Sequence, residues 1–97
     1  MTVTVLKTAR ADLSKGYWFY EAQEPGLGTY FLDRIYEDLA LLGGIAGIHR
    51  KTASGSHKMI ARRFPYAIYY KVNQGVVEVN AIIDGRRSPE WIKRRLK

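Results

Sequence analysis

The chain contains no cysteine, only two histidines and no apolar run long enough to cross a bilayer. Without cysteine, a disulfide framework and a thiolate metal site are excluded, and His49 with His57 cannot complete a zinc site alone. A membrane-spanning helix needs about 20 apolar residues. Residues 1–6 alternate and are too few for a signal peptide. We therefore expect a soluble, cytoplasmic protein that binds no membrane, metal or cofactor.

Acidic residues are scarce in the second half of the chain. The 97 residues include 16 Lys and Arg but nine Asp and Glu, which gives a net charge of +7. Residues 1–48 hold four basic and six acidic residues, a balance of −2, whereas residues 49–97 hold twelve basic and three acidic ones, a balance of +9. This concentration predicts a polyanionic partner, either nucleic acid or an acidic protein, rather than a surface charged only for solubility.

Hydrophobic periodicity predicts a single domain over residues 1–97 with the order β-α-α-β-β-β and a short C-terminal helix. The expected strands cover residues 2–7, 57–64, 66–72 and 76–83. A first helix begins at Ala9, with Thr8 as its cap and Asp12 in its first turn. A second helix covers residues 27–42 and is stopped by Gly43–Gly44.

Two helices followed by an antiparallel meander imply an α+β fold, in which a helical hairpin covers one face of an antiparallel sheet. On the helices, Leu13, Tyr17 and Tyr20 share a core-facing stripe. Strand alternation turns Tyr69 to the opposite face of the sheet. The same alternation in the last strand groups four residues on one face: Val77, Val79, Ala81 and Ile83.

Two pairs of arginines bracket the hairpin formed by the last two strands. Arg62 and Arg63 precede the first of these strands, and Arg86 and Arg87 follow the second. In an antiparallel hairpin the start of one strand lies beside the end of the other, so the two pairs are expected at the same end of the sheet. Together with Lys58 they form a predicted site for phosphate or for another anionic target group.

The sequence Arg-Phe-Pro-Tyr-Ala-Ile-Tyr-Tyr at residues 63–70, followed by Asp-Gly-Arg-Arg at residues 84–87, resembles a known pattern. It is similar to the "RFPYxIxY … HGRR" pattern of the RelE/ParE toxin superfamily, in its ParE-like branch. The Ala-Asp-Leu at residues 11–13 also matches a frequent feature of that superfamily. Asp84 is a departure, because many relatives carry histidine there.

The resemblance implies a toxin of a type II toxin–antitoxin module, of the plasmid-stabilisation kind, that is held in a hetero-oligomer by its cognate antitoxin. ParE-like members inhibit DNA gyrase, and we expect this target. The alternative is a RelE-like endoribonuclease that cuts messenger RNA on the ribosome. A second alternative is a non-toxic nucleic-acid-binding domain with the same fold.

Residues needed for RNA cleavage are incomplete, so we expect no catalytic residue. The resemblance implies that RelE-like nucleases carry an arginine where this chain has Ala67, and a tail tyrosine where it has Trp91. Only Arg87 matches a nuclease phosphate contact. Histidine is a common proton-transfer residue, but His57 follows a Gly-Ser loop and is expected to be a solvated histidine that nothing orients.

The C-terminal segment is amphipathic, with Trp91, Ile92 and Leu96 among basic residues. It is too short to be a stable helix alone, so it either docks on the sheet or stays mobile until a partner binds. Its three apolar side chains are the predicted anchors for an acidic antitoxin tail. Trp91 and Tyr69 are also candidate stacking platforms, unless the terminal helix covers Tyr69.

Overall fold

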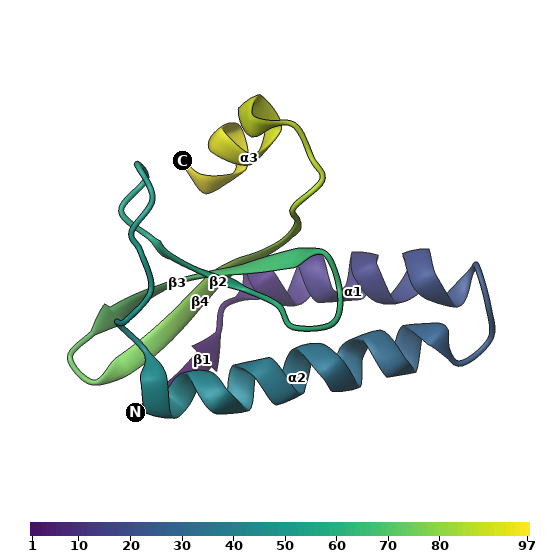
Figure 1. Ribbon diagram of the computed structural model, residues 1–97, viewed down its shortest axis with the longest axis horizontal. Helices are drawn as coiled ribbons and strands as arrows, with labels where there is room; N and C mark the ends of the chain where they lie inside the picture. Colours follow the sequence, from purple (N-terminus) through teal and green to yellow (C-terminus); the bar gives the residue numbers. More distant parts are fainter.

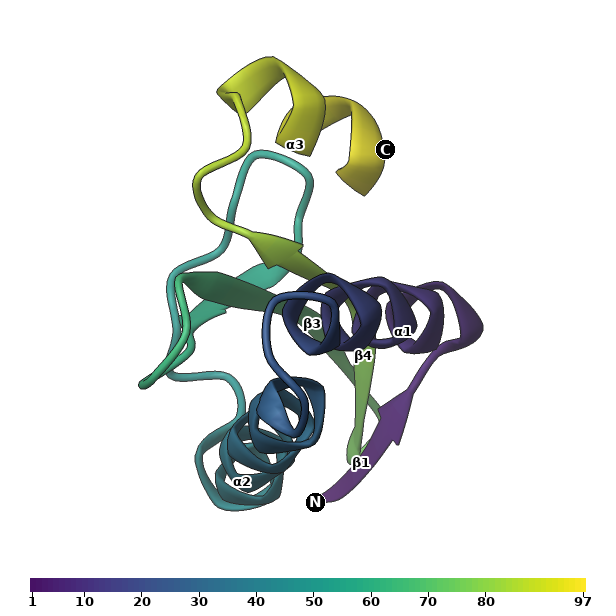
Figure 2. The same ribbon diagram turned by 90° about the vertical axis from the view of Figure 1, so that its right-hand side faces the viewer.

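The computed structural model describes all 97 residues and confirms the predicted order of elements. The elements are β1 (Thr2–Val5), α1 (Lys7–Glu21), α2 (Leu27–Ile45), β2 (His57–Ile60), β3 (Tyr66–Asn73), β4 (Val76–Asp84) and α3 (Pro89–Leu96). The two long helices form a hairpin on one side of the sheet, and α3 lies on the other side (Figures 1 and 2). None of the helices combines the length and the apolar character needed to cross a membrane.

The four strands form one mixed sheet in the order β1-β4-β3-β2. The pairs β2–β3 and β3–β4 are antiparallel as predicted, but β1 pairs in parallel with β4. The expectation of a purely antiparallel sheet is therefore wrong. Parallel strands need a long crossover connection, and the helical hairpin followed by β2 and β3 supplies it. The alternation within residues 2–5 carries no information about the direction of the partner strand.

The tight turn between β3 and β4 is built from Gln74 and Gly75. Their φ angles are 50° and 78°, and the flanking residues Asn73 and Val76 are paired. Positive φ at both central positions is typical of the two-residue hairpin turn whose twist matches that of the strands. This turn fixes the register of the hairpin that carries both arginine pairs.

A β-bulge in β4 changes which of its residues face the helices. Tyr69 pairs with Ala81, whereas the next residue, Tyr70, pairs with Val79, so Asn80 is the extra residue of β4. Val77 and Val79 pack toward the helical hairpin, but Ala81 and Ile83 point to the opposite face, and Ile82 takes the helix-facing position. The predicted grouping of all four residues on one face is therefore wrong, because an inserted residue reverses the alternation.

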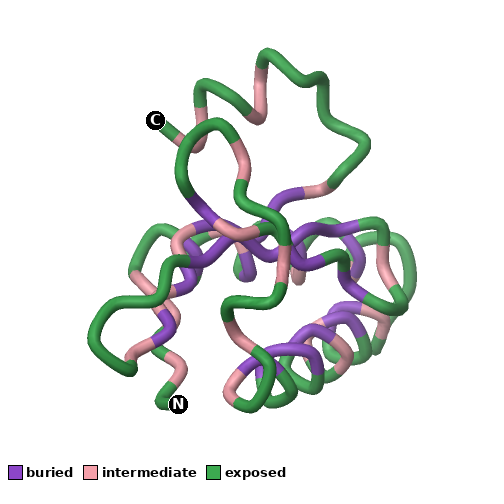
Figure 3. Tube along the Cα trace, turned by 60° about the vertical axis from the view of Figure 1, so that its left-hand side comes forward, coloured by how far each residue is buried: buried purple, intermediate pink, exposed green.

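Both faces of the sheet are covered. A cluster of 15 buried residues lies between the sheet and the helical hairpin. A smaller cluster on the other face is covered by Trp91, Ile92 and Leu96 of α3, and it consists of Ala67, Tyr69, Ala81 and Ile83. Figure 3 shows buried segments along the strands and the inner sides of the long helices, whereas α3 has no buried residue. The terminal helix therefore docks on the sheet, which was one of the two predicted alternatives.

Side chains of α1 replace a missing strand beside the last part of β4. Because β1 ends at Val5, opposite Val79, β4 has no strand neighbour on that side beyond the bulge. Thr8 Oγ1 donates to the Asn80 carbonyl at 2.9 Å, and Asp12 Oδ2 accepts from the Ile82 N–H at 3.0 Å. The predicted capping role of Thr8 is wrong, since α1 begins at Lys7 and has no side-chain cap. Asp12 likewise lies beyond the first turn of the helix.

Close packing of the helical hairpin depends on Gly16. A Cβ atom at this position would lie 2.6 Å from the Phe31 ring, so only glycine allows α1 and α2 to approach this closely. Gly16 therefore occupies the buried stripe, and Tyr17, which we expected in the core, is only half-buried.

Three predicted boundaries need correction. α2 continues through Gly43 and Gly44 to Ile45, and the Gly43 carbonyl accepts from the Met1 ammonium at 2.8 Å. β1 ends at Val5, two residues before the predicted limit. β2 ends at Ile60 rather than at residue 64, because the chain turns back at once to begin β3. At the end of α2, the two glycines lower the helix propensity but do not end the helix, because contacts with the rest of the chain support its final turn.

Candidate functional site

The two arginine pairs lie at the same end of the sheet, as predicted. The Ala61 N–H donates to the Tyr66 carbonyl at 2.9 Å, and the Gly85 N–H donates to the Pro65 carbonyl at 2.7 Å. These bonds place the segment 61–65 beside the turn that follows β4. The four guanidinium groups differ, however, in what holds them.

Arg62 is engaged in holding the fold together. Its Nε donates to Asp38 Oδ1 at 2.6 Å, and its backbone N–H donates to Asp38 Oδ2 at 3.2 Å. Asp38 lies on α2 and is only 1% exposed, so Arg62 neutralises a buried carboxylate. Removal of this arginine would leave that charge unpaired.

Arg86 is also paired within the chain. Its Nε and Nη2 donate to the two carboxylate oxygens of Asp84 at 2.9 and 2.7 Å. The hydrogen bond from Arg86 lowers the pKa of Asp84 below its ordinary value, so this carboxylate stays ionised. Asp84, at the position where many superfamily members carry histidine, thus serves as the partner of Arg86. Of the four predicted anion-binding arginines, Arg62 and Arg86 are therefore already paired with carboxylates of the chain.

Arg63 and Arg87 have no carboxylate partner. The structure contains five ion pairs, and neither residue takes part in any of them. Arg63 and Arg87 are both exposed. The Arg87 guanidinium lies over the Trp91 ring, with its Cζ 4.4 Å from the ring centroid. The aromatic ring positions Arg87 without neutralising its charge. These two arginines remain available to an anionic partner.

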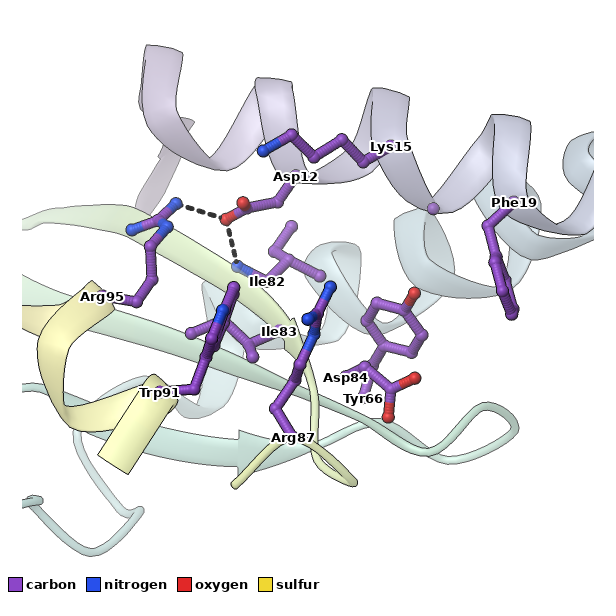
Figure 4. A pocket seen from close by; sticks show the side chains of 11 residues that line it. Asp12, Lys15, Phe19, Tyr66, Ile82, Ile83, Asp84, Arg87, Trp91 and Arg95 are labelled. Carbon is purple, nitrogen blue, oxygen red and sulfur yellow. Dashed lines mark hydrogen bonds and ion pairs between the residues drawn. The ribbon is translucent and has the colours of Figure 1, made fainter. Parts of the chain in front are cut away.

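Two cavities flank α3. The first lies between α1, the end of the sheet and α3 (Figure 4). Its volume is about 420 Å³, and Arg87 and Trp91 project into it. Asp12 in its wall accepts from both Ile82 N and Arg95 Nη2, the latter at 2.6 Å. Burial raises the pKa of the Tyr66 phenol to about 12, so this hydroxyl keeps its proton at neutral pH. The acidic groups of this cavity are already paired with cations of the chain.

The second cavity is a groove of about 520 Å³ on the other side of α3, facing the loop of residues 52–54. We call it the α3 groove. Four of its lining residues are cations that take part in no ion pair, and none of its lining residues is acidic. These cations are Lys58, Arg87, Lys93 and Lys97. Of the predicted anion-binding residues, the structure therefore brings Lys58 and Arg87 together at this groove, which the predicted residues Tyr69, Ile92 and Leu96 also line.

Lys93 and Lys97 were not among the residues predicted for the site. The signal that points to them is their spacing of four residues, which puts both on one side of a helix, next to the predicted anchors Ile92 and Leu96. Which cavity they face depends on how α3 docks, and the sequence of α3 alone does not determine this.

Tyr69 forms part of the floor of the α3 groove but is not an open stacking platform. Its side chain is 2% exposed, and burial raises the pKa of its phenol. Trp91, Ile92 and Leu96 pack on the cluster that contains it. Of the two alternatives left open for Tyr69, the structure shows the one in which the terminal helix covers it. Trp91 is half-buried and carries Arg87 on one ring face.

His57 is held in place and lies away from the groove. Its Nδ1 donates to the His49 carbonyl at 2.7 Å, and its ring stacks on Tyr70 at a centroid distance of 5.0 Å. The expectation of a histidine that nothing orients is wrong. Along β2, however, Lys58 points into the groove, and so alternation turns His57 to the helix-facing side.

The described chain contains no group of three or more His, Cys, Asp or Glu side chains arranged to hold a metal ion. The surface around α3 offers hydrogen-bond donors, cations and apolar floor. Its chemistry suits binding of an anionic macromolecule rather than proton transfer.

No protein-family model and no curated protein matches the chain. Among solved structures, it is similar to a chain of the "Chromosomal ParDE TA system from P. aeruginosa", with a TM-score of 0.77 and 20% sequence identity. The similarity covers 87% of this chain and 95% of the other. At this level of identity the likeness establishes the fold. The protein therefore has the ParE-like α+β fold that its sequence motifs predicted.

Proposed function

We propose that the protein is the toxin of a type II toxin–antitoxin module, which acts in the cytoplasm and is neutralised by a cognate antitoxin. The observation that carries this proposal is the ParE-like fold combined with a surface of unpaired cations around α3. A basic surface on a domain of net charge +7 favours an acidic or phosphate-bearing macromolecule as its partner.

The target that we propose is DNA gyrase. The similarity of residues 63–70 and 84–87 to the ParE-like pattern supports this choice. The chemistry of the groove supports it too, because its lining residues include no histidine, aspartate or glutamate to act as a general acid or base. Its tyrosine is buried with a raised phenol pKa, and His57 faces the other side of the sheet. Inhibition by binding requires no such residue.

The experiment that tests this proposal is induced expression in bacteria, with growth, DNA topology and messenger RNA integrity followed in the same cultures. We expect growth arrest with loss of negative supercoiling in a reporter plasmid, while messenger RNA remains intact. Codon-dependent cleavage of messenger RNA on ribosomes would instead identify a RelE-like nuclease. Unimpaired growth at a verified level of folded protein would support a non-toxic nucleic-acid-binding domain.

A further inference from the structure

We propose that the α3 groove is the docking site for a short acidic, amphipathic segment of a partner protein. This inference rests on the proposed function, in which the partner is the antitoxin. The inference goes beyond the proposed function in two respects. It places the antitoxin segment in the groove between α3 and residues 52–54, and it states the chemistry of that segment.

The cations of the α3 groove come from three separate elements of the chain. Lys58 comes from β2, Arg87 from the turn after β4, and Lys93 and Lys97 from α3. Residues distant in sequence thus place three lysines around one groove that has no acidic lining residue, and Arg87 lies at the boundary between this groove and the first cavity. The basic residues Arg62, Arg86 and Arg95, in contrast, all pair with carboxylates of the chain itself. Four cations without internal partners favour a ligand that brings several carboxylates.

An apolar floor lies between these cations. Ile92 and Leu96 are half-buried and line the groove one turn apart, with Tyr69 beneath them. A phosphate backbone would gain little from this floor. A peptide with leucine-like side chains between its carboxylates would bury apolar surface there. The floor therefore favours an amphipathic peptide over a nucleic acid.

The wall of the groove opposite α3 is already formed. In the loop of residues 52–56, the Thr52 N–H donates to the Ser56 carbonyl at 2.7 Å, and the Gly55 N–H donates to the Thr52 carbonyl at 3.0 Å. Thr52 Oγ1 and Ser54 Oγ are also within hydrogen-bond distance, at 2.8 Å. A wall held by its own hydrogen bonds reduces the ordering cost of binding.

The size of the groove limits its occupant to a short segment. A volume of about 520 Å³ is within the range of pockets that hold small ligands, and it accommodates a few side chains rather than a folded domain. One or two turns of a partner helix, or a short extended strand, suit this space. A disordered acidic tail that folds on binding has the required properties.

The experiment uses the full chain and a synthetic 14-residue peptide of Glu and Leu. Its Leu residues are three and four positions apart, so that they share one face of a helix, and all other positions are Glu. A second peptide replaces every Leu by Gln and keeps the charge, and a 14-nucleotide oligothymidylate represents nucleic acid. The groove variant is Lys58→Glu with Lys93→Glu. The matched control is Lys7→Glu with Lys71→Glu, since both lysines are exposed, lie outside the groove and give the same change in charge. Thermal unfolding verifies that all variants fold.

We expect the affinity of the Glu-Leu peptide for the wild type to be at least tenfold higher than its affinity for the groove variant. Its affinity for the control variant should be within twofold of its affinity for the wild type. The Gln-substituted peptide should bind at least tenfold more weakly than the Glu-Leu peptide. Equal loss of affinity in both variants, equal binding of both peptides, or tighter binding of oligothymidylate that displaces the Glu-Leu peptide would overturn the proposal.

Toxicity is scored separately, which distinguishes the two proposals. If expression of the wild type does not arrest growth while the peptide results hold, the proposed toxin function fails and the groove assignment stands. If expression arrests growth but the groove variant binds the Glu-Leu peptide like the wild type, the docking site is wrong and the toxin function stands.

Discussion

Asp12 and Arg95 form an ion pair that joins the two sides of the sheet. Arg95 Nη2 lies 2.6 Å from Asp12 Oδ2, the same oxygen that accepts from the Ile82 N–H. One carboxylate on α1 therefore completes the hydrogen bonding of β4 and also anchors α3, which covers the second hydrophobic cluster. The position of α3, and with it the shape of the α3 groove, depends on this contact.

The first prediction concerns this ion pair. Asp12→Ala leaves the Ile82 N–H without its acceptor and Arg95 without its carboxylate partner, so we expect the free energy of unfolding to fall by about 1–3 kcal/mol. Arg95→Gln should cost less, because the Arg95 side chain is 25% exposed. Urea denaturation of the single and double variants measures both effects, and the losses should not add. Wild-type stability in Asp12→Ala would show that the contact does not hold α3.

The second prediction concerns pH. Burial and the neighbouring His57 lower the pKa of His49 below its ordinary value of 6.5. Its Nδ1 lies 2.5 Å from the Tyr70 hydroxyl, which also accepts from the Gly47 N–H, so neutral His49 is the form that accepts the hydroxyl proton.

As the pH falls below about 6.5, the unfolded chain binds a proton at His49 that the folded chain resists. The free energy of unfolding should therefore decrease from pH 7.5 to pH 5.5, and level off below the pKa of the folded state. Denaturation of wild type and His49→Gln at both pH values isolates this contribution. Identical pH dependence in the two proteins would contradict the assignment.

The third prediction separates the two arginines of the turn after β4. Because Arg87 has no carboxylate partner, Arg87→Ala should abolish growth inhibition and change the melting temperature by less than about 2 °C. Arg86→Ala removes the partner of Asp84 and should lower stability as well as toxicity. Full toxicity in the double variant Arg86→Ala, Arg87→Ala, at wild-type protein levels, would remove this turn from the mechanism.

The fourth prediction concerns the terminal helix. Truncation after Ser88 removes α3 and exposes the cluster around Tyr69. We expect lower stability, greater binding of a hydrophobic dye and faster dissociation of the antitoxin, since apolar contacts mainly set dissociation rates. Raised salt should mainly slow association of the intact chain. An unchanged dissociation rate after truncation would show that α3 is not part of the antitoxin site.

Much of the fold follows from local patterns in the sequence. Pro25–Gly26 separates the two long helices, Gln74–Gly75 closes the hairpin, and Ser88 with Pro89 begins α3, where the Ser88 hydroxyl accepts from the Trp91 N–H. Hairpin geometry alone places the arginine pairs at one end of the sheet.

The remainder depends on contacts between residues distant in sequence. Parallel pairing of β1, the bulge at Asn80 and the burial of Tyr69 arise only when α1 and α3 pack against β4. For the same reason, the sequence did not distinguish the paired Arg86 from the unpaired Arg87. A charged side chain's role depends on its partner, and that partner is determined by tertiary packing.

The most direct test of the account is a supercoiling assay with purified DNA gyrase, relaxed plasmid and ATP. Wild-type protein should inhibit the introduction of negative supercoils in a dose-dependent way, and Arg87→Ala at the same concentration should not. Ribosomes programmed with messenger RNA and treated with the same preparation should show intact message. Unimpaired supercoiling at saturating protein, together with cleavage of ribosome-bound messenger RNA, would contradict the account.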